Sequence, residues 1–178
     1  TIVQGNLNNP KDVKRIIEGL ASHDVIVVAG FQGVCPKTKD ITTLGRGGSD
    51  LTAVALAKVL SAKTCQIYTD TPGVMSADPR LIEKPHTLKN LSWQQASSLA
   101  TSGAKVLHDR SAYLAEKEQI TLEIINSKNP KDNSTRISST PLEHKEIYAI
   151  THQKDQKFLK TSFNKNAYTN LLNFLKKN

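Results

Sequence analysis

Residues 45–70 read GRGGSDLTAVALAKVLSAKTCQIYTD, and this stretch decides the fold. A glycine-rich turn at 45–50 opens an alanine-rich segment, 51–62, whose composition favours a helix. The segment 66–69 follows after a short connection, and we expect it to form a buried strand, covered on both faces. The stretch therefore predicts a helix packed beside a buried strand.

The same pattern recurs along the chain. β-Branched apolar runs at 25–29 and 120–125 predict two more buried strands. Ser92 and Gln95 form a capping box, which predicts the start of another helix. The expected helices span 11–20, 51–62, 93–101 and 111–117. Because strands alternate with helices, we predict an α/β protein, a three-layer α/β/α sandwich with a mostly parallel sheet.

The stretch 126–141 is polar and contains two prolines, so it predicts a domain boundary. We expect one domain over residues 1–137 and a second unit over 138–178. In this second unit, strands are expected at 147–151 and 158–161 and a helix at 168–176. A strand-strand-helix unit buries little surface by itself, so we expect this tail to be part of a larger module.

The net charge of +8 lies mainly in the tail. Residues 1–127 hold 14 basic and 12 acidic side chains, whereas residues 128–178 hold 10 and 4. A basic tail can bind nucleic acid. This one lacks the aromatic–basic pattern of a single-strand binder, and its lysines are scattered, so a solvated surface is the favoured interpretation. No apolar run reaches the 18 residues or so of a membrane span.

Neither cysteine nor histidine predicts a metal site. The five histidines and two cysteines lack the spacing of metal ligands. Cys35 and Cys65 lie in or beside apolar runs, and we expect small buried thiols in a reducing cytoplasm.

The glycine-rich turn at 45–50 is the sharpest local feature. Its glycines allow backbone N–H groups to approach an anion. The following helix, with Ser49 or Asp50 as N-cap, adds a positive dipole, and Arg46 offers parallel donors to a carboxylate or phosphate. The turn lacks the Gly-Lys-Ser/Thr end of a Walker A loop and the third glycine of a dinucleotide fingerprint. An anion site and a plain strand-to-helix turn both fit this pattern.

Two further segments carry polar groups. Thr69 and Asp70 end a predicted strand, and ligands usually bind at the carboxyl ends of such strands. Asp78 and Arg80 are suited to a metal-linked water and a phosphate, or alternatively to capping turns in a surface loop. Lys105 follows a helix-breaking glycine and is suited to contact phosphates, although a solvated lysine fits equally well.

In this order and at these spacings, the features resemble the aspartokinase family. The matching stretches are VAGFQG (28–33), TTLGRGGSD (42–50), YTD (68–70), GV (73–74), ADPR (77–80) and GAKVLH (103–108). The resemblance runs from about residue 25 to residue 137, and TTLGRGGSD is its most specific string. It implies the amino-acid kinase fold and ATP-dependent phosphorylation of the β-carboxylate of L-aspartate, the first step towards lysine, methionine and threonine.

Carried over residue by residue, the resemblance implies two ligand sites. L-Aspartate would be held by Arg46, Gly47, Gly48 and Ser49, with Arg46 paired to a substrate carboxylate, and Asp50 would orient the catalytic network. ATP would contact Thr69, Asp70, Met75, Ser76, Ala77, Asp78, Pro79, Arg80 and Lys105, with Mg²⁺ bridging its phosphates. Met75 stands where the family usually has a tyrosine.

The family opens with a strand and a Lys-Phe-Gly-Gly-Thr loop that supplies a phosphate-clamping lysine, and this loop does not occur in the 178 residues. We therefore expect the C-terminal part of an aspartokinase catalytic domain with the start of an ACT-like regulatory region, inactive alone. The alternative is a non-catalytic product that binds a nucleotide or a partner subunit. We further expect a cytoplasmic protein, homo-oligomeric at full length, that binds neither nucleic acid nor a membrane.

Overall fold

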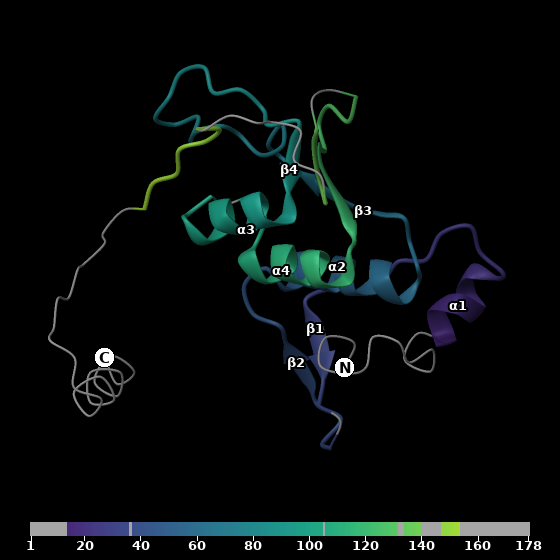
Figure 1. Ribbon diagram of the computed structural model, residues 1–178. Coiled ribbons are helices and arrows are strands. Elements are labelled where there is room, and N and C mark those ends of the chain that lie inside the picture. The colour runs from purple at the N-terminus through teal and green to yellow at the C-terminus, as the bar shows by residue number, and fades with distance from the viewer. Residues whose placement is uncertain (1–13, 36, 105, 132–133, 140–146, 154–178) are drawn as a thin grey trace, which may run out of the picture.

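The computed structural model describes residues 14–35, 37–104, 106–131, 134–139 and 147–153. Helices and strands are interspersed along these residues, and several follow one another in pairs of the same kind (Figure 1). The elements are α1 (Lys14–Leu20), β1 (Gln32–Val34), β2 (Ile41–Thr43), α2 (Gly48–Val59), β3 (Thr64–Thr69), β4 (Asn90–Ser92), α3 (Trp93–Thr101), α4 (Asp109–Glu118), β5 (Thr121–Asn126) and β6 (Thr135–Ser138).

A four-stranded sheet with the order β3-β5-β6-β4 forms the centre of the fold. β3 and β5 are parallel, from Thr64 opposite Thr121 to Thr69 opposite Asn126. β4 and β6 are also parallel, whereas β5 and β6 are antiparallel. Helices α3 and α4 lie between β3 and β5 in the sequence, as a parallel connection requires. The sheet is therefore mixed, with parallel strands flanked by helices, and the predicted α/β class is confirmed.

Helices α2, α3 and α4 lie together beside this sheet and enclose the core (Figure 1). α4 packs against both α2 and α3. The largest fully buried side chains come mainly from the strands and the segments that lead into them: Leu88, Leu91, Leu122, Ile124 and Ile137. Removing each such side chain from water stabilises the fold by roughly 1.5–3 kcal/mol. The buried apolar side chains of the sheet and its helices form one hydrophobic core.

The opposite face of β3 and β5 carries polar side chains. Gln66 donates from Nε2 to Glu123 Oε2 over 3.0 Å, and Tyr68 Oη donates to Gln66 Oε1 over 3.3 Å. Tyr68 remains 56% exposed. The expectation that the strand at 66–69 is covered on both faces therefore does not hold in the described part of the chain. On the uncovered face, polar side chains form hydrogen bonds with one another.

α3 begins where the sequence predicts. Ser92 Oγ accepts a hydrogen bond from Gln95 N (3.1 Å), and Gln95 Oε1 accepts one from Ser92 N (2.8 Å), which completes the capping box. Trp93 then donates from Nε1 to Ile120 O over 3.0 Å and ties α3 to the start of β5. The other predicted helices and strands between residues 51 and 126 are observed within three residues of their expected ends.

Residues 25–29 do not form the predicted strand. The side chains of Val25 and Val27 are 76% and 93% exposed, and no described strand pairs with this run. Residues 147–151 likewise form no strand with any described strand. The side chains of Ile147 and Ile150 in this run are exposed. The elements predicted at 158–161 and 168–176 lie outside the described residues, as does the start of the helix predicted at 11–20.

Two short pairings were not predicted. β1 and β2 form an antiparallel hairpin, with Gln32 opposite Thr43. β4 and β6 complete the sheet although each has only three or four residues. None of the helices in the described part of the chain has the length and apolar character needed to cross a membrane.

Candidate functional site

The glycine-rich loop leads directly into α2. Gly47 is the N-cap residue and has a left-handed backbone, with φ 73° and ψ 11°, a conformation that favours glycine. Because Leu51 N donates to Gly47 O over 3.1 Å, the helix starts earlier than predicted, and the expected N-cap at Ser49 or Asp50 was wrong. Gly48 N donates to Gly45 O over 3.0 Å, but no side chain caps α2, so the N–H groups of Ser49 and Asp50 keep the donor capacity that helix N-termini offer to anions.

The charges around this loop have distinct environments. Arg46 and Ser49 are exposed, whereas Asp50 is half-buried. Burial raises the pKa of the Asp50 carboxyl, and the charge of His108 offsets part of this rise. An exposed guanidinium beside the positive end of a helix dipole is suited to a carboxylate ligand.

The first turn of α4 packs onto the same loop. A side chain on Gly47 would collide with Cβ and Cγ of His108. Two residues further along, Arg110 Nη1 donates to Leu44 O over 2.8 Å. The loop is therefore held by residues more than 60 positions away, and sequence reasoning gave neither of these residues a role.

The second candidate segment follows the carboxyl end of β3. Thr69 is the last residue of this strand, and its hydroxyl donates to Asp70 Oδ1 over 3.3 Å. Further along, Asp78 accepts hydrogen bonds from Arg80 N (2.9 Å), Nε (3.0 Å) and Nη2 (2.6 Å). These bonds hold the pKa of Asp78 well below its usual value. The Arg80 side chain is nevertheless 68% exposed, so its guanidinium remains accessible to solvent.

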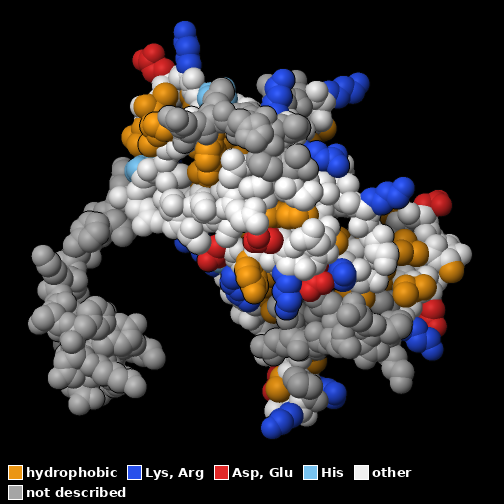
Figure 2. Space-filling view, in the orientation of Figure 1, with side chains coloured by type: hydrophobic (Ala, Val, Ile, Leu, Met, Phe, Trp, Pro, Cys, Tyr) orange, Lys and Arg blue, Asp and Glu red, His pale blue; other side chains and the backbone are white. Residues whose placement is uncertain are grey.

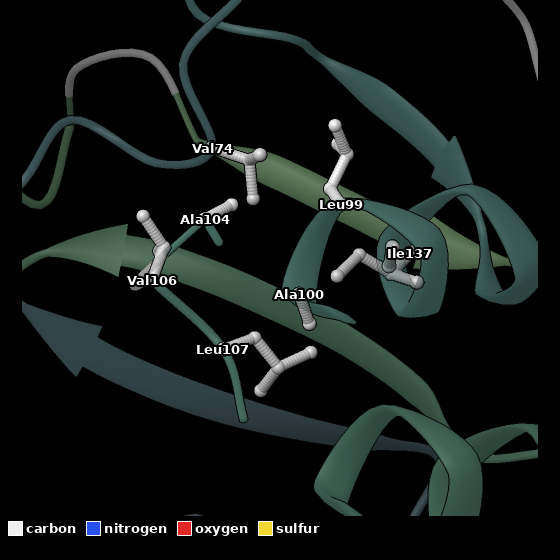
Figure 3. A pocket seen from close by; sticks show the side chains of 8 residues that line it. Val74, Leu99, Ala100, Ala104, Val106, Leu107 and Ile137 are labelled. Carbon is white, nitrogen blue, oxygen red and sulfur yellow. The ribbon is translucent and has the colours of Figure 1, made fainter. Parts of the chain in front are cut away.

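A small apolar hollow is lined by residues next to the segment 75–80 and next to Lys105 (Figure 3). Val74, Ala104 and Val106 line one side of it, and Leu99, Ala100 and Ile137 line the other. Val74 immediately precedes the segment 75–80. Ala104 and Val106 flank Lys105, which itself lies outside the described residues. Packing around the hollow therefore fixes the start of the segment 75–80 beside the neighbours of Lys105.

The chain between Ala104 and His108 touches both candidate sites. Ala104 lies at the hollow beside Val74, and His108 lies against Gly47. Four residues span at most about 14 Å, so Ala104 and His108 lie no farther apart than that.

A segment from beyond the predicted domain boundary also reaches this region. Ile150 N donates to Ser76 O over 2.8 Å, and His152 Nδ1 lies 3.8 Å from Asp78 Oδ2. Gln153 Nε2 donates to Thr101 O at the end of α3 over 3.0 Å. The segment 147–153 thus contacts the segment 75–80, which is the candidate nucleotide segment. No local pattern in the sequence indicated this contact.

Comparison with known proteins identifies the family. The amino acid kinase family profile matches residues 5–126, which is more than half of the chain. The chain belongs to the amino acid kinase family. Among curated relatives, aspartokinase from Mycobacterium tuberculosis is 38% identical over 145 residues, covering 80% of this chain and 34% of that protein. Aspartokinase from Thermus thermophilus is 48% identical over 113 residues, covering 64% and 28%.

Solved structures of kinases agree with this assignment. E. coli aspartokinase III in complex with aspartate and ADP matches with a TM-score of 0.68 and 33% identity, covering 74% of this chain and 29% of that one. The same enzyme in complex with lysine and aspartate matches with a TM-score of 0.64 and 32% identity, covering 75% and 30%. This family member therefore spans about a third of the length of the relatives it matches.

Figure 2 shows one face of this kinase-family chain. On that face the Lys and Arg side chains of the described residues are spread out, with acidic and apolar side chains between them. Such a distribution is typical of a solvated surface.

Proposed function

We propose that this chain carries ligand-binding parts of an aspartate kinase. The reaction transfers the γ-phosphoryl group of ATP to the β-carboxylate of L-aspartate and yields ADP and 4-phospho-L-aspartate. The observation that carries the proposal is the string TTLGRGGSD at 42–50, which ends on the N-terminus of α2 in a chain whose aspartokinase relatives are 38–48% identical.

The chemistry of the glycine-rich loop supports binding of L-aspartate. An amino acid with two carboxylates needs cationic groups and donors, and the loop offers the exposed Arg46 beside the uncapped first turn of α2. In this proposal Arg46 pairs with a substrate carboxylate. Gly47, Gly48 and Ser49 supply close backbone and hydroxyl contacts, and Asp50 orients the reacting groups.

The end of the sheet supports binding of ATP. Thr69 and Asp70 end β3, where ligands of open α/β sheets usually bind, and the exposed Arg80 offers charge to a phosphate. We assign the remaining contacts to Met75, Ser76, Ala77, Asp78, Pro79 and Lys105. Mg²⁺ would arrive with the nucleotide, because it prefers phosphate oxygens and water with one or two carboxylates, and Asp70 and Asp78 are the carboxylates present on these segments.

Transfer of this kind depends on positioning and on neutralising charge. Aspartate and the terminal phosphate are both anionic, so each needs a cationic partner before they can approach. Arg46 would neutralise a carboxylate of L-aspartate, and Arg80 and Lys105 would neutralise phosphate charge on ATP. We further propose that the whole protein acts in the cytoplasm as a homo-oligomer in the biosynthesis of lysine, methionine and threonine, and that residues 138–178 begin a regulatory region.

Ligand binding tests this proposal without requiring turnover. Isothermal titration of the 178-residue chain with L-aspartate, and separately with a non-hydrolysable ATP analogue and Mg²⁺, is expected to give saturable binding of both. Arg46→Ala is expected to weaken binding of L-aspartate by about tenfold or more, the loss typical of a charged hydrogen bond, and to leave the nucleotide affinity within about twofold. Arg15→Ala, at an exposed arginine on α1, is the matched control.

The outcomes separate the candidate functions. If the chain binds neither ligand, or if Arg46→Ala weakens both equally, the aspartate role of the loop is wrong. Nucleotide binding without any affinity for L-aspartate would favour the alternative of a non-catalytic nucleotide-binding protein. Production of ADP that depends on L-aspartate would establish transfer directly.

A further inference from the structure

His108 lies against the glycine-rich loop at the start of α4. It immediately precedes α4, and a Cβ atom on Gly47 would collide with its Cβ, Cγ and Cδ2 atoms. The ring therefore lies directly on the α-carbon of the N-cap residue of α2. Gly47 has a positive φ, a conformation that glycine adopts without steric cost, and the ring of His108 packs against it there.

The orientation of the ring follows from its neighbours. Nδ1 of His108 lies 2.6 Å from Asp109 Oδ1 and 3.4 Å from the backbone N of Arg110. The shorter contact requires a proton on Nδ1, and Arg110 N has its own acceptor in Asp109 Oδ1 at 2.8 Å. The ring thus donates to Asp109. This bond fixes the plane of the imidazole that covers Gly47.

Arg110 holds the start of the same loop. Its Nη1 donates to Leu44 O over 2.8 Å, while Leu44 N donates to Phe31 O over 2.9 Å. The first turn of α4 therefore contacts the loop at two points, one before and one within the string GRGGSD. The segment that includes Lys105 leads directly into this turn.

We propose that His108 is a positioning residue for the ligand of the glycine-rich loop: its ring holds Gly47 in the conformation that presents the first-turn N–H groups of α2 to a carboxylate. The inference rests on the proposed function of the loop as the L-aspartate site. It adds a residue that the resemblance left without a role.

Two variants separate this positioning role from simple capping of α4. His108→Asn removes the ring but keeps a favoured N-cap residue, so α4 is retained. His108→Phe keeps a ring over Gly47 but removes the bond to Asp109. If the ring positions Gly47, His108→Asn weakens binding of L-aspartate by about tenfold, and His108→Phe recovers most of that loss.

The experiment is isothermal titration of the full 178-residue chain with L-aspartate and with a non-hydrolysable ATP analogue, alongside thermal unfolding. His108→Asn is expected to unfold within about 4 °C of the wild type, roughly the shift of a sub-kcal/mol change, and to keep its nucleotide affinity within about twofold. His23→Asn, at an exposed histidine after α1, is the control.

Each result bears on a different statement. A wild-type chain that binds no L-aspartate overturns the proposed function, and the inference falls with it. Wild-type binding with unchanged affinity in His108→Asn overturns the inference alone. An equal loss of both ligands in His108→Asn, or a greater loss in His108→Phe than in His108→Asn, also overturns it, because either result assigns His108 a general structural role.

Discussion

The hydroxyl of Thr135 on β6 accepts a hydrogen bond from the backbone N of Val74 over 2.8 Å, joining residues 61 positions apart. Thr135 is fully buried. A side chain on Gly73 would lie 2.6 Å from the same hydroxyl, and Gly73 has φ 119°, so glycine is required there on two grounds. This bond fixes the residue that immediately precedes the candidate nucleotide segment.

Thr135→Val tests the importance of this bond for stability. Valine has nearly the same shape but cannot accept a hydrogen bond, so the buried N–H of Val74 would be left unpaired. We expect the free energy of unfolding to fall by about 1–3 kcal/mol, measured by urea denaturation. Thr135→Ser keeps the hydroxyl and loses one methyl group, with an expected loss of about 0.8 kcal/mol. A valine variant as stable as the serine variant would show that the hydroxyl contributes little.

Asp50→Asn tests the environment at the start of α2. The pKa of Asp50 is raised above its ordinary value of 3.8, mainly by burial. The native state therefore binds the proton more tightly than the unfolded chain, and ionisation lowers the stability of the native state as the pH rises above about 3.8. The asparagine variant cannot ionise, so its melting temperature relative to the wild type is expected to rise between pH 3 and pH 7.

Thermal unfolding at pH 3, 5 and 7 measures this difference, with Asp24→Asn at an exposed position as the control. The same substitution is expected to impair the proposed catalytic role of Asp50, so a gain in stability would accompany a loss of activity. A difference that shrinks towards neutral pH would mean that Asp50 is stabilising as an anion, and that the helix dipole outweighs burial.

The two cysteines are expected to react with thiol reagents at very different rates. Cys35 is half-buried, and hydrogen bonds from the Thr38 side chain, Thr38 N and Lys37 N lower its pKa. Cys65 is buried in β3, and burial, with a smaller effect from Asp50, raises its pKa to about 11. Because the thiolate is the reactive form, native protein at pH 8 should label quickly at Cys35 alone.

Peptide mass mapping after brief exposure to an aromatic disulfide reagent identifies the labelled thiol. Cys35→Ser should abolish the fast phase, and both thiols should react after unfolding in urea. Rapid labelling of Cys65 in the native protein would mean that β3 opens to solvent far more readily than its buried position beside α2 suggests.

Local sequence determined the elements whose signals lie within a few residues. The capping box of Ser92 and Gln95 set the start of α3, and the alanine-rich run set α2 to within three residues. The glycine-rich turn and the Thr-Asp end of β3 were predicted for the same reason. Backbone propensity, capping and turn chemistry act over one or two helical turns, so they can be read without knowing the rest of the fold.

Only the tertiary structure decided the features that depend on distant partners. Thr135 and its neighbours looked like part of a polar boundary, yet they form β6, because pairing with β5 and β4 depends on residues far along the chain. The apolar run at 25–29 looked like a buried strand, but burial requires a covering layer, which the described residues do not supply. The contact of His108 with Gly47 arises because α4 packs against α2, and no pattern within either segment encodes that approach.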